Sequence, residues 1–320
     1  MSDQIRHSDG LFHERSFDDI DRQAAELSGY DQSYRQMSKG RFSGRFSSLV
    51  LPGHEGVHIE RVNQVIEQTA AVPRGQIAAL FLLSGQALCR LGSLDFAMGD
   101  MALFGEGAEI QFRNALDTVV CVVSLSVDRL VGRWPEGDQR LGQGGSLMVR
   151  QGRSPIPGIV ATAARTMEDG RQRGDLKAAP LIDRLGLRLE DEVQKLLSGE
   201  PPNKQDPAGA PPHRRVFAQA MRIVETNLDR DLPVSRLASD VGVSRRALEY
   251  AFHEAVGLGP AHYIQRRRLN AVRQALSGEG PVTIGDVTAR FGIWHLSRFA
   301  SQYRDLFGEL PSETLRRTHR

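Results

Sequence analysis

Residues 237–260 read LASDVGVSRRALEYAFHEAVGLGP, and residues 287–311 read VTARFGIWHLSRFASQYRDLFGELP. Both stretches follow one pattern: a short apolar segment, a glycine, an apolar pair four residues apart, and a closing Gly-x-x-Pro. Gly242 and Gly292 lie 50 positions apart, whereas Gly257 and Gly308 lie 51 apart, so the second copy has one extra residue. An internal repeat of this kind constrains the architecture before any single residue is interpreted.

Each copy predicts a helix-turn-helix. The expected first helices cover residues 234–240 and 284–290, and each is followed by a glycine that tolerates positive φ and lets the chain reverse. The expected second helices begin near Ser244 and His295. Their apolar residues fall four apart, so one face of each helix turns inward.

A connecting helix is expected from Pro260 to about Ser277, where glycines follow. Two recognition helices joined by one stiff helix can enter successive major grooves on one side of a duplex, ~34 Å apart. The side chains that this geometry turns outward, and that we expect to contact DNA, are Ser244, Arg245, Arg246, Glu249, Tyr250 and His253 in the first copy and His295, Ser297, Arg298, Ser301, Gln302 and Arg304 in the second. Arg246 and Arg298 are the best candidates for bidentate bonds to guanine.

The charge distribution agrees with a DNA-binding module. From Pro211 to the end the sequence has 17 Arg, no Lys and 11 acidic residues, a net charge of +6, and the rest of the chain carries −4. The whole-chain value of +2 therefore hides a basic module attached to a mildly acidic one, which is typical of DNA-binding proteins. The three arginines at 266–268 cannot all face a duplex from one helix. One or two of them contact phosphate, or all are solvated.

The repeat resembles the DNA-binding domain of the AraC/XylS family of bacterial transcription regulators. Residues 292–315 look most like the branch that holds the benzoate-responsive and ethanolamine-operon regulators, and the resemblance covers about 100 of the 320 residues. It implies a transcription activator that contacts RNA polymerase, responds to a small-molecule effector and forms a homodimer. Thr288 stands where the family prefers Ala and Ser301 where many members carry a charged residue, so the second recognition helix is expected to read fewer bases.

The fold class expected for the chain is α+β with two domains. Short apolar runs separated by turns predict strands at 45–51, 57–65, 77–83, 86–91, 101–104, 109–113 and 118–125, which favours a sandwich or small barrel. A cupin-like barrel can hold a small ligand, and the family resemblance implies the same. The expected organisation is a cupin-like β sensor domain at 15–150, helices at 157–197, a flexible linker at 198–213 and an AraC-type DNA-binding domain at 214–320.

Two interpretations of the helices at 157–197 stay open. They form a dimer interface, as the family resemblance implies, or they cover the open end of the barrel. Ser198–His213 is rich in Pro and Gly and cannot build a core, so it predicts a loose tether. Any signal would then pass through a switched contact or through dimer geometry.

Residues 54–58 match the zinc-protease pattern His-Glu-x-x-His, which requires a helix to bring both imidazoles to one metal. Here Pro52 and Gly53 precede the pattern and a strand follows it. In a strand His54 and His58 would lie ~13 Å apart, too far to share a zinc ion. We therefore expect no metal, no cofactor and no enzymatic activity.

The remaining composition predicts a cytoplasmic protein. No apolar run reaches ~18 residues, so no membrane span is expected, and the polar N-terminus predicts no secretory signal. Cys89 and Cys121 lie in apolar contexts and are expected to be buried, reduced thiols. A second class of function stays open: a constitutive DNA-binding protein whose barrel serves only dimerisation or a protein partner. A filled interior would favour that class, and an apolar pocket with convergent polar groups would favour a sensor.

Overall fold

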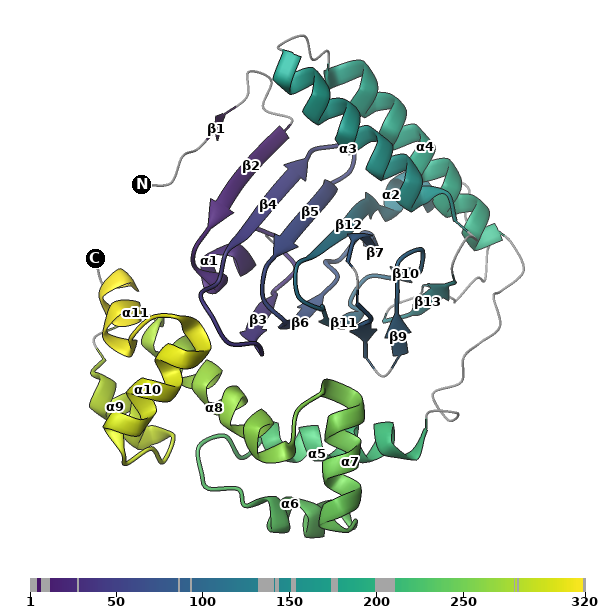
Figure 1. The fold of residues 1–320 in the computed structure, drawn as a ribbon. Helices are drawn as coiled ribbons and strands as arrows, with labels where there is room; N and C mark the ends of the chain where they lie inside the picture. Colours follow the sequence, from purple (N-terminus) through teal and green to yellow (C-terminus); the bar gives the residue numbers. More distant parts are fainter. Residues whose placement is uncertain are drawn as a thin grey trace. The chain divides into compact units, whose positions relative to one another are not determined.

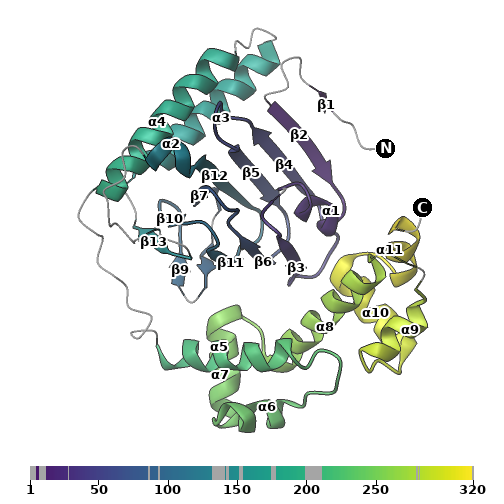
Figure 2. The same cartoon turned by 180° about the vertical axis from the view of Figure 1, so that it is seen from behind.

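The computed structural model describes residues 5–6, 12–27, 29–85, 87–92, 94–131, 141, 144–150, 154–173, 178–198, 211–278, 280 and 282–318. The chain divides into two compact units (Figures 1 and 2). The first unit comprises residues 1–34 and 42–204, and the second comprises residues 35–41 and 205–320. Most of the expected linker at 198–213 lies outside the described residues.

The first unit contains two antiparallel sheets. The larger sheet has the strand order β1 (Ile5–Arg6), β2 (Phe12–Phe17), β4 (Gly44–Leu49), β5 (Gly56–Val62), β12 (Thr118–Ser126), β7 (Gln76–Ser84), β10 (Met101–Phe104) and β13 (Ser146–Val149). The smaller has the order β3 (Ser33–Gln36), β6 (Ile66–Ala71), β11 (Glu109–Arg113), β8 (Cys89–Leu91) and β9 (Leu94–Phe96). The described strands form two sheets and close no barrel, so the α+β class and the sheet-rich unit hold, whereas the cupin-like barrel remains an expectation.

The strand predicted at 57–65 is shorter in the structure, and the next strand, β6 (Ile66–Ala71), which was not predicted, lies in the other sheet. β5 ends at Val62 and β6 begins at Ile66. Asn63 turns the chain between them: its side-chain oxygen accepts a hydrogen bond from the Ser43 amide at 2.8 Å, and its own amide donates to the Ser43 carbonyl at 3.1 Å. Asn favours such turns because its short amide side chain hydrogen-bonds to nearby backbone.

Apolar side chains on both faces of the larger sheet form two separate cores, because successive residues of a strand point to opposite faces. Val62, Val120 and Leu82 point toward the smaller sheet and pack with Ile66 and Phe112. The residues of opposite parity pack against helices α3 (Ile156–Arg173) and α4 (Ala178–Ser198), which lie side by side across one face of this sheet (Figure 1). The two helices therefore cover a sheet face, which is a different position from the open end of a barrel.

Short helices complete the first unit. α1 (Ile20–Ala24) begins after Asp19, whose carboxylate accepts from the Arg22 amide at 2.9 Å, and α2 (Val127–Val131) follows β12 directly. Both cysteines are buried and free. Among the described helices none is long and apolar enough to cross a lipid bilayer.

The second unit is helical. Its elements are α5 (Pro212–Glu225), α6 (Val234–Val241), α7 (Arg245–Val256), α8 (Pro260–Leu276), α9 (Ile284–Arg290), α10 (Leu296–Phe307) and α11 (Pro311–Thr318). α8 contributes to two cores: Tyr263 packs edge-on against Phe217 and Phe252 at its first turns, and Leu269 packs near Phe299 and Tyr303 farther along. It is therefore the common support of both helix-turn-helix units (Figure 2).

Helix α11 was not expected from the repeat. Pro311 provides its first residue, as Pro commonly does because its missing N–H is not needed there. Glu313 accepts a hydrogen bond from the Leu310 amide at 2.6 Å, a capping contact at the helix start. The helix closes the core of the second helix-turn-helix.

Candidate nucleic-acid interface

The first turn is built as the sequence predicts. Gly242 ends α6 in the left-handed region with φ of 75°, and its amide donates to Ser239. Ser244 then begins α7 by accepting from the Ala247 amide at 3.2 Å. Ser244, predicted as a DNA contact, therefore also serves as the N-cap of the recognition helix.

The buried side of α7 fixes its outer face. Leu248, Phe252 and Val256 are buried, so the predicted contacts on the opposite side are left exposed or half-buried. Arg245 forms an i,i+4 ion pair with Glu249 at 3.0 Å, which competes with base contacts for both side chains. Arg246 is exposed and has no polar partner within the described residues, so its guanidinium is free to bind a base edge.

The second unit repeats this design with small differences. Thr283 accepts from the Asp286 amide at 3.1 Å at the start of α9. Gly292 has φ of 65° and occupies the turn, and His295 is the residue before α10 but makes no side-chain capping bond. The predicted contact residues on α10 and its cap are all exposed except Gln302, which is half-buried; they are His295, Ser297, Arg298, Ser301, Gln302 and Arg304.

Two large apolar side chains at the start of α10 were missed by the sequence reasoning. Trp294 is 77% exposed and Leu296 is 51% exposed. The signal was available, because neither lies on the stripe of Phe299, Tyr303 and Phe307 that faces the core. Exposed aromatic side chains next to a recognition helix can contact the apolar C5-methyl of thymine in the major groove.

A cleft of about 630 Å³ lies beside these residues, where the residues before α6, the first half of α8 and the second turn meet. Its lining includes the polar or cationic side chains of His262, Arg268, His295, Arg298 and Gln302, the aromatic Trp294 and the acidic Asp231. The exposed Arg298 suits the negatively charged backbone of a nucleic acid, whereas the charge of Asp231 opposes it.

The three consecutive arginines of α8 are engaged inside the unit. Arg266 donates to the Met37 carbonyl, Arg267 is buried and pairs with Glu225, and Arg268 donates to the Leu228 carbonyl at 3.1 Å. They bind α8 to residues 35–41, to the end of α5 and to the turn that follows α5. The expectation that they are solvated or bind phosphate is wrong for Arg267 and incomplete for the other two.

The His-Glu-x-x-His segment is a turn followed by a strand, as expected. His54 Nε2 lies 2.7 Å from Glu190 Oε1 on α4, and its Nδ1 accepts from the Ser126 amide at 3.0 Å. His58 lies on β5, stacks on Phe46, and burial lowers its pKa to about 4. Each imidazole thus has a separate structural environment within the described residues.

A second group of polar side chains lies between the two sheets of the first unit. The Tyr34 hydroxyl donates to Glu60, and Gln68 Nε2 donates to Gln32 Oε1 at 2.8 Å. Glu60 is 2% exposed, and burial raises its pKa to about 8. Among the described residues, Oε1 of Glu60 and Oε1 of Gln23 are buried without a hydrogen-bond partner. Because the raised pKa keeps a proton on Glu60, its carboxyl can donate to the neighbouring Gln23 side chain while it accepts from Tyr34.

Comparison with known proteins covers the helical unit. A model described as a helix-turn-helix domain matches residues 237–317. The XylDLEGF operon transcriptional activator of Pseudomonas putida is 37% identical over 102 residues, which are 31% of this chain and 32% of that protein. The XylDLEGF operon transcriptional activator 2 of the same organism is 39% identical over 103 residues, 31% of this chain and 64% of that protein. A probable AraC family transcriptional regulator from Rhodopseudomonas palustris, a solved structure, is 34% identical, covering 32% of this chain and 97% of that one with a TM-score of 0.31.

Two helix-turn-helix units on a common helix, with exposed basic side chains on their outer faces, define a double helix-turn-helix DNA-binding domain. The helical unit is therefore similar to the helix-turn-helix domains of these transcriptional regulators. The match spans about a third of the length of the first of these activators, so the activity of the whole protein is inferred below.

Proposed function

We propose that this chain is a ligand-responsive transcription activator that reads two adjacent major-groove segments of double-stranded DNA. The observation that carries the proposal is the matched pair of recognition helices. Each has an exposed arginine, Arg246 on α7 and Arg298 on α10, for which the described residues provide no ion-pair partner. An Arg side chain aimed at a groove makes two parallel hydrogen bonds to guanine O6 and N7. The remaining predicted residues on both helices orient the domain through bases and phosphates.

The effector would bind between the sheets of the first unit, the part of the chain for which we propose the role of a cupin-like sensor. Supporting this are the convergent polar groups around Glu60, Tyr34 and Gln68, set among apolar side chains. Small-molecule sites combine an apolar lining with a few placed polar groups. Glu60 can both donate and accept in its protonated form, so the effector we propose carries polar groups that can replace its bond from Tyr34.

We also propose that the chain activates transcription by contacting RNA polymerase and that it acts in the cytoplasm; the similarity to the XylDLEGF operon activators supports the activation. Homodimerisation is proposed through the outer side of α4, where Leu187 is 61% exposed beside the stripe that packs on the sheet. We propose no catalytic role for the chain.

The test is binding of the full chain to genomic DNA fragments at 0.15 M salt, a concentration stated because phosphate contacts make affinity salt-dependent. We expect selective capture of a few fragments, and a change in that affinity when a small molecule with hydrogen-bond donors is added. Selective binding that no small molecule alters would replace the sensor with a constitutive DNA-binding protein. Capture without selectivity would overturn the DNA-reading proposal itself.

A further inference from the structure

Seven residues in the middle of the strand-rich part of the sequence belong to the helical unit. Residues 35–41 group with residues 205–320, although Tyr34 before them and Phe42 after them belong to the first unit. The segment comprises the last two residues of β3 and the stretch that leads from β3 toward β4. Its contacts with α8 and α10 are therefore contacts within the second unit.

Asn270 of α8 binds the backbone of this segment as another strand would. Its Oδ1 accepts from the Gln36 amide at 2.8 Å and its Nδ2 donates to the Gln36 carbonyl at 2.9 Å. Nδ2 also donates to the Arg266 carbonyl at 2.8 Å, one turn earlier in the same helix. Asn270 and Gln36 are both buried, so losing these bonds would leave buried polar groups without partners.

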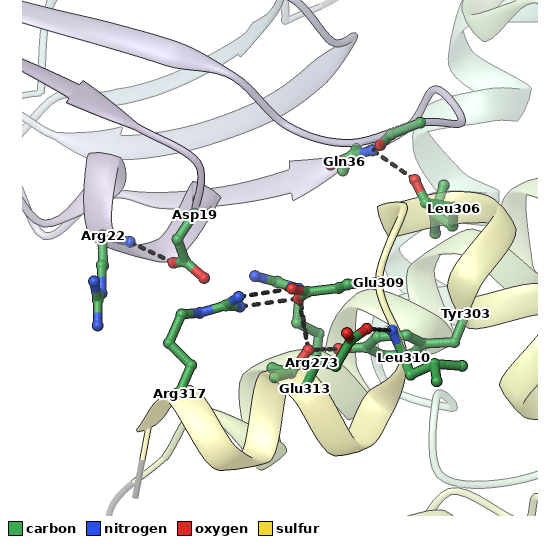
Figure 3. A network of polar contacts seen from close by, with 12 residues as sticks. Asp19, Arg22, Gln36, Arg273, Tyr303, Leu306, Glu309, Leu310, Glu313 and Arg317 are labelled. Carbon is green, nitrogen blue, oxygen red and sulfur yellow. Dashed lines mark hydrogen bonds and ion pairs between the residues drawn. The ribbon is translucent and has the colours of Figure 1, made fainter. Parts of the chain in front are cut away.

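The end of α10 holds the other side of the segment. Gln36 Nε2 donates to the Leu306 carbonyl at 2.6 Å (Figure 3), and the Gly40 amide donates to the same carbonyl at 3.1 Å. A Cβ on Gly308 would lie 2.8 Å from the backbone of Arg41, so only glycine permits this approach. The Leu306 carbonyl is one of the last in α10 and has no intrahelical donor of its own.

The segment therefore joins the connecting helix to the second recognition helix. Asn270 lies on α8 and Leu306 on α10, and a single glutamine binds both. The relative placement of α8 and α10 determines whether the two recognition helices match successive grooves. Docking of the segment should hold that placement.

The segment is also joined by the chain to the polar side chains that lie between the two sheets of the first unit. Tyr34, whose hydroxyl donates to Glu60, is the residue immediately before it. On the other side, β4 carries Phe46, which pairs in register with Glu60. An effector that takes the place of the Tyr34 hydroxyl on Glu60 would move the backbone at one end of the segment.

We propose that residues 35–41 are a strap that couples effector binding in the first unit to the DNA-competent placement of α10 in the second. The docked strap favours DNA binding and the released strap disfavours it, so an effector acts by preferring one of these states. The effector half of this inference rests on the proposed sensor function; the effect of the strap on DNA affinity does not.

The experiment combines amide hydrogen exchange with DNA binding, on the full chain and without effector. Two near-isosteric variants each remove a side-chain donor that holds the strap. Asn270→Asp removes the donor from α8 to the Gln36 carbonyl, and Gln36→Glu removes the donor from the segment to the Leu306 carbonyl. Asn227→Asp is the matched control, because Asn227 Nδ2 caps the end of α5 by donating to the Ile223 carbonyl at 2.7 Å and touches no part of the strap. The DNA is a fragment that the wild-type chain binds selectively.

In the wild type the amides of Gln36 and Gly40 should exchange slowly. Each strap variant should speed their exchange and weaken DNA binding about tenfold, since two or more buried hydrogen bonds are lost. The double variant should weaken it no further than either single one, because both remove the same docked state. Should Asn270→Asp also speed exchange throughout α5–α7, Gln36→Glu carries the test alone.

Rapid hydrogen exchange of the Gln36 and Gly40 amides in the wild type would contradict the strap proposal. Variants that speed the exchange of these amides but change DNA affinity by less than twofold would also contradict it. If no small molecule alters DNA binding, the proposed sensor function is wrong, but the strap can still fix the placement of α10 relative to α8. The two failures are therefore distinguishable.

Discussion

Arg273 of α8 and Glu309, in the turn before α11, form an ion pair in which the arginine side chain is 4% exposed. Glu309 also receives Arg317 at 2.6 Å and Thr314 at 2.6 Å, and Tyr303 reaches the same group through Thr314 at 2.8 Å (Figure 3). This network ties the connecting helix to the last two helices of the second helix-turn-helix.

Replacing Glu309 by Gln should destabilise the helical unit by about 3 kcal/mol, because Arg273 would keep its charge in a buried site without a counter-ion. Asp240→Asn is the control: it breaks an exposed i,i+4 pair with Arg236 at 3.7 Å, which is worth less than about 1 kcal/mol. Urea unfolding at pH 7, followed by circular dichroism, measures both. Equal midpoints for the two variants would contradict the role given to Glu309.

The same network makes stability depend on acid. Burial alone would raise the pKa of Glu309, but bonds from Arg317 and Arg273 outweigh it and lower the pKa to about 2. A carboxyl whose pKa is lower in the folded state contributes stability above its unfolded value of 4.5, and that contribution is lost as pH falls toward 2. Glu309→Gln should show a smaller loss over this range than the wild type.

Glu60 should act with the opposite sign. Burial raises its pKa to about 8, so the folded state holds a proton that the unfolded state releases above about 4.5. Stability from this group therefore falls as pH rises from about 4.5 through 8. Between pH 6 and 9 the wild type should lose about 2–3 kcal/mol more than Glu60→Gln, whose amide cannot ionise. Parallel stability curves for the two proteins over that range would mean that Glu60 is ionised when folded.

Trp294 should contribute to base readout. We expect Trp294→Ala to weaken binding to a selected DNA site by about 1–3 kcal/mol and to remove the preference for thymine at one position. Replacing that thymine by uracil deletes only the methyl group, so it should weaken the wild type and leave the Trp294→Ala variant unaffected. If uracil weakens both proteins equally, Trp294 does not contact the methyl. Arg316→Ala, exposed on α11, serves as a control.

The repeat was predictable because its determinants are local. Gly242, Ser244 and Thr283 act on backbone within a few residues of themselves, and the four-residue spacing of Leu248 and Phe252 sets the buried face. The outward side chains followed from the same spacing, which is why the predicted contact residues lie exposed or half-buried in the structure.

The contacts that were not predicted involve residues far apart in the sequence. Gln36 binds Asn270, 234 positions away, and nothing in the local sequence of residues 35–41 indicates it. The sequence alone predicts that Arg267 is solvated, because its ion-pair partner Glu225 lies on another helix. The polar group around Glu60 likewise requires the pairing of β4, β5 and β12 and the packing of the second sheet. Strand alternation predicts which face a residue lies on, but not which partner faces it.

Selection of bound sequences from a randomised DNA library at 0.15 M salt tests most directly whether the two recognition helices contact two groove segments. The wild-type chain should enrich two blocks of specified bases whose centres are about 10 base pairs apart. Arg246→Ala should relax one block and Arg298→Ala the other, each at a cost of ~1–3 kcal/mol. A single block, or uniform weakening of both blocks by either variant, would contradict the hypothesis that each recognition helix contacts its own groove segment.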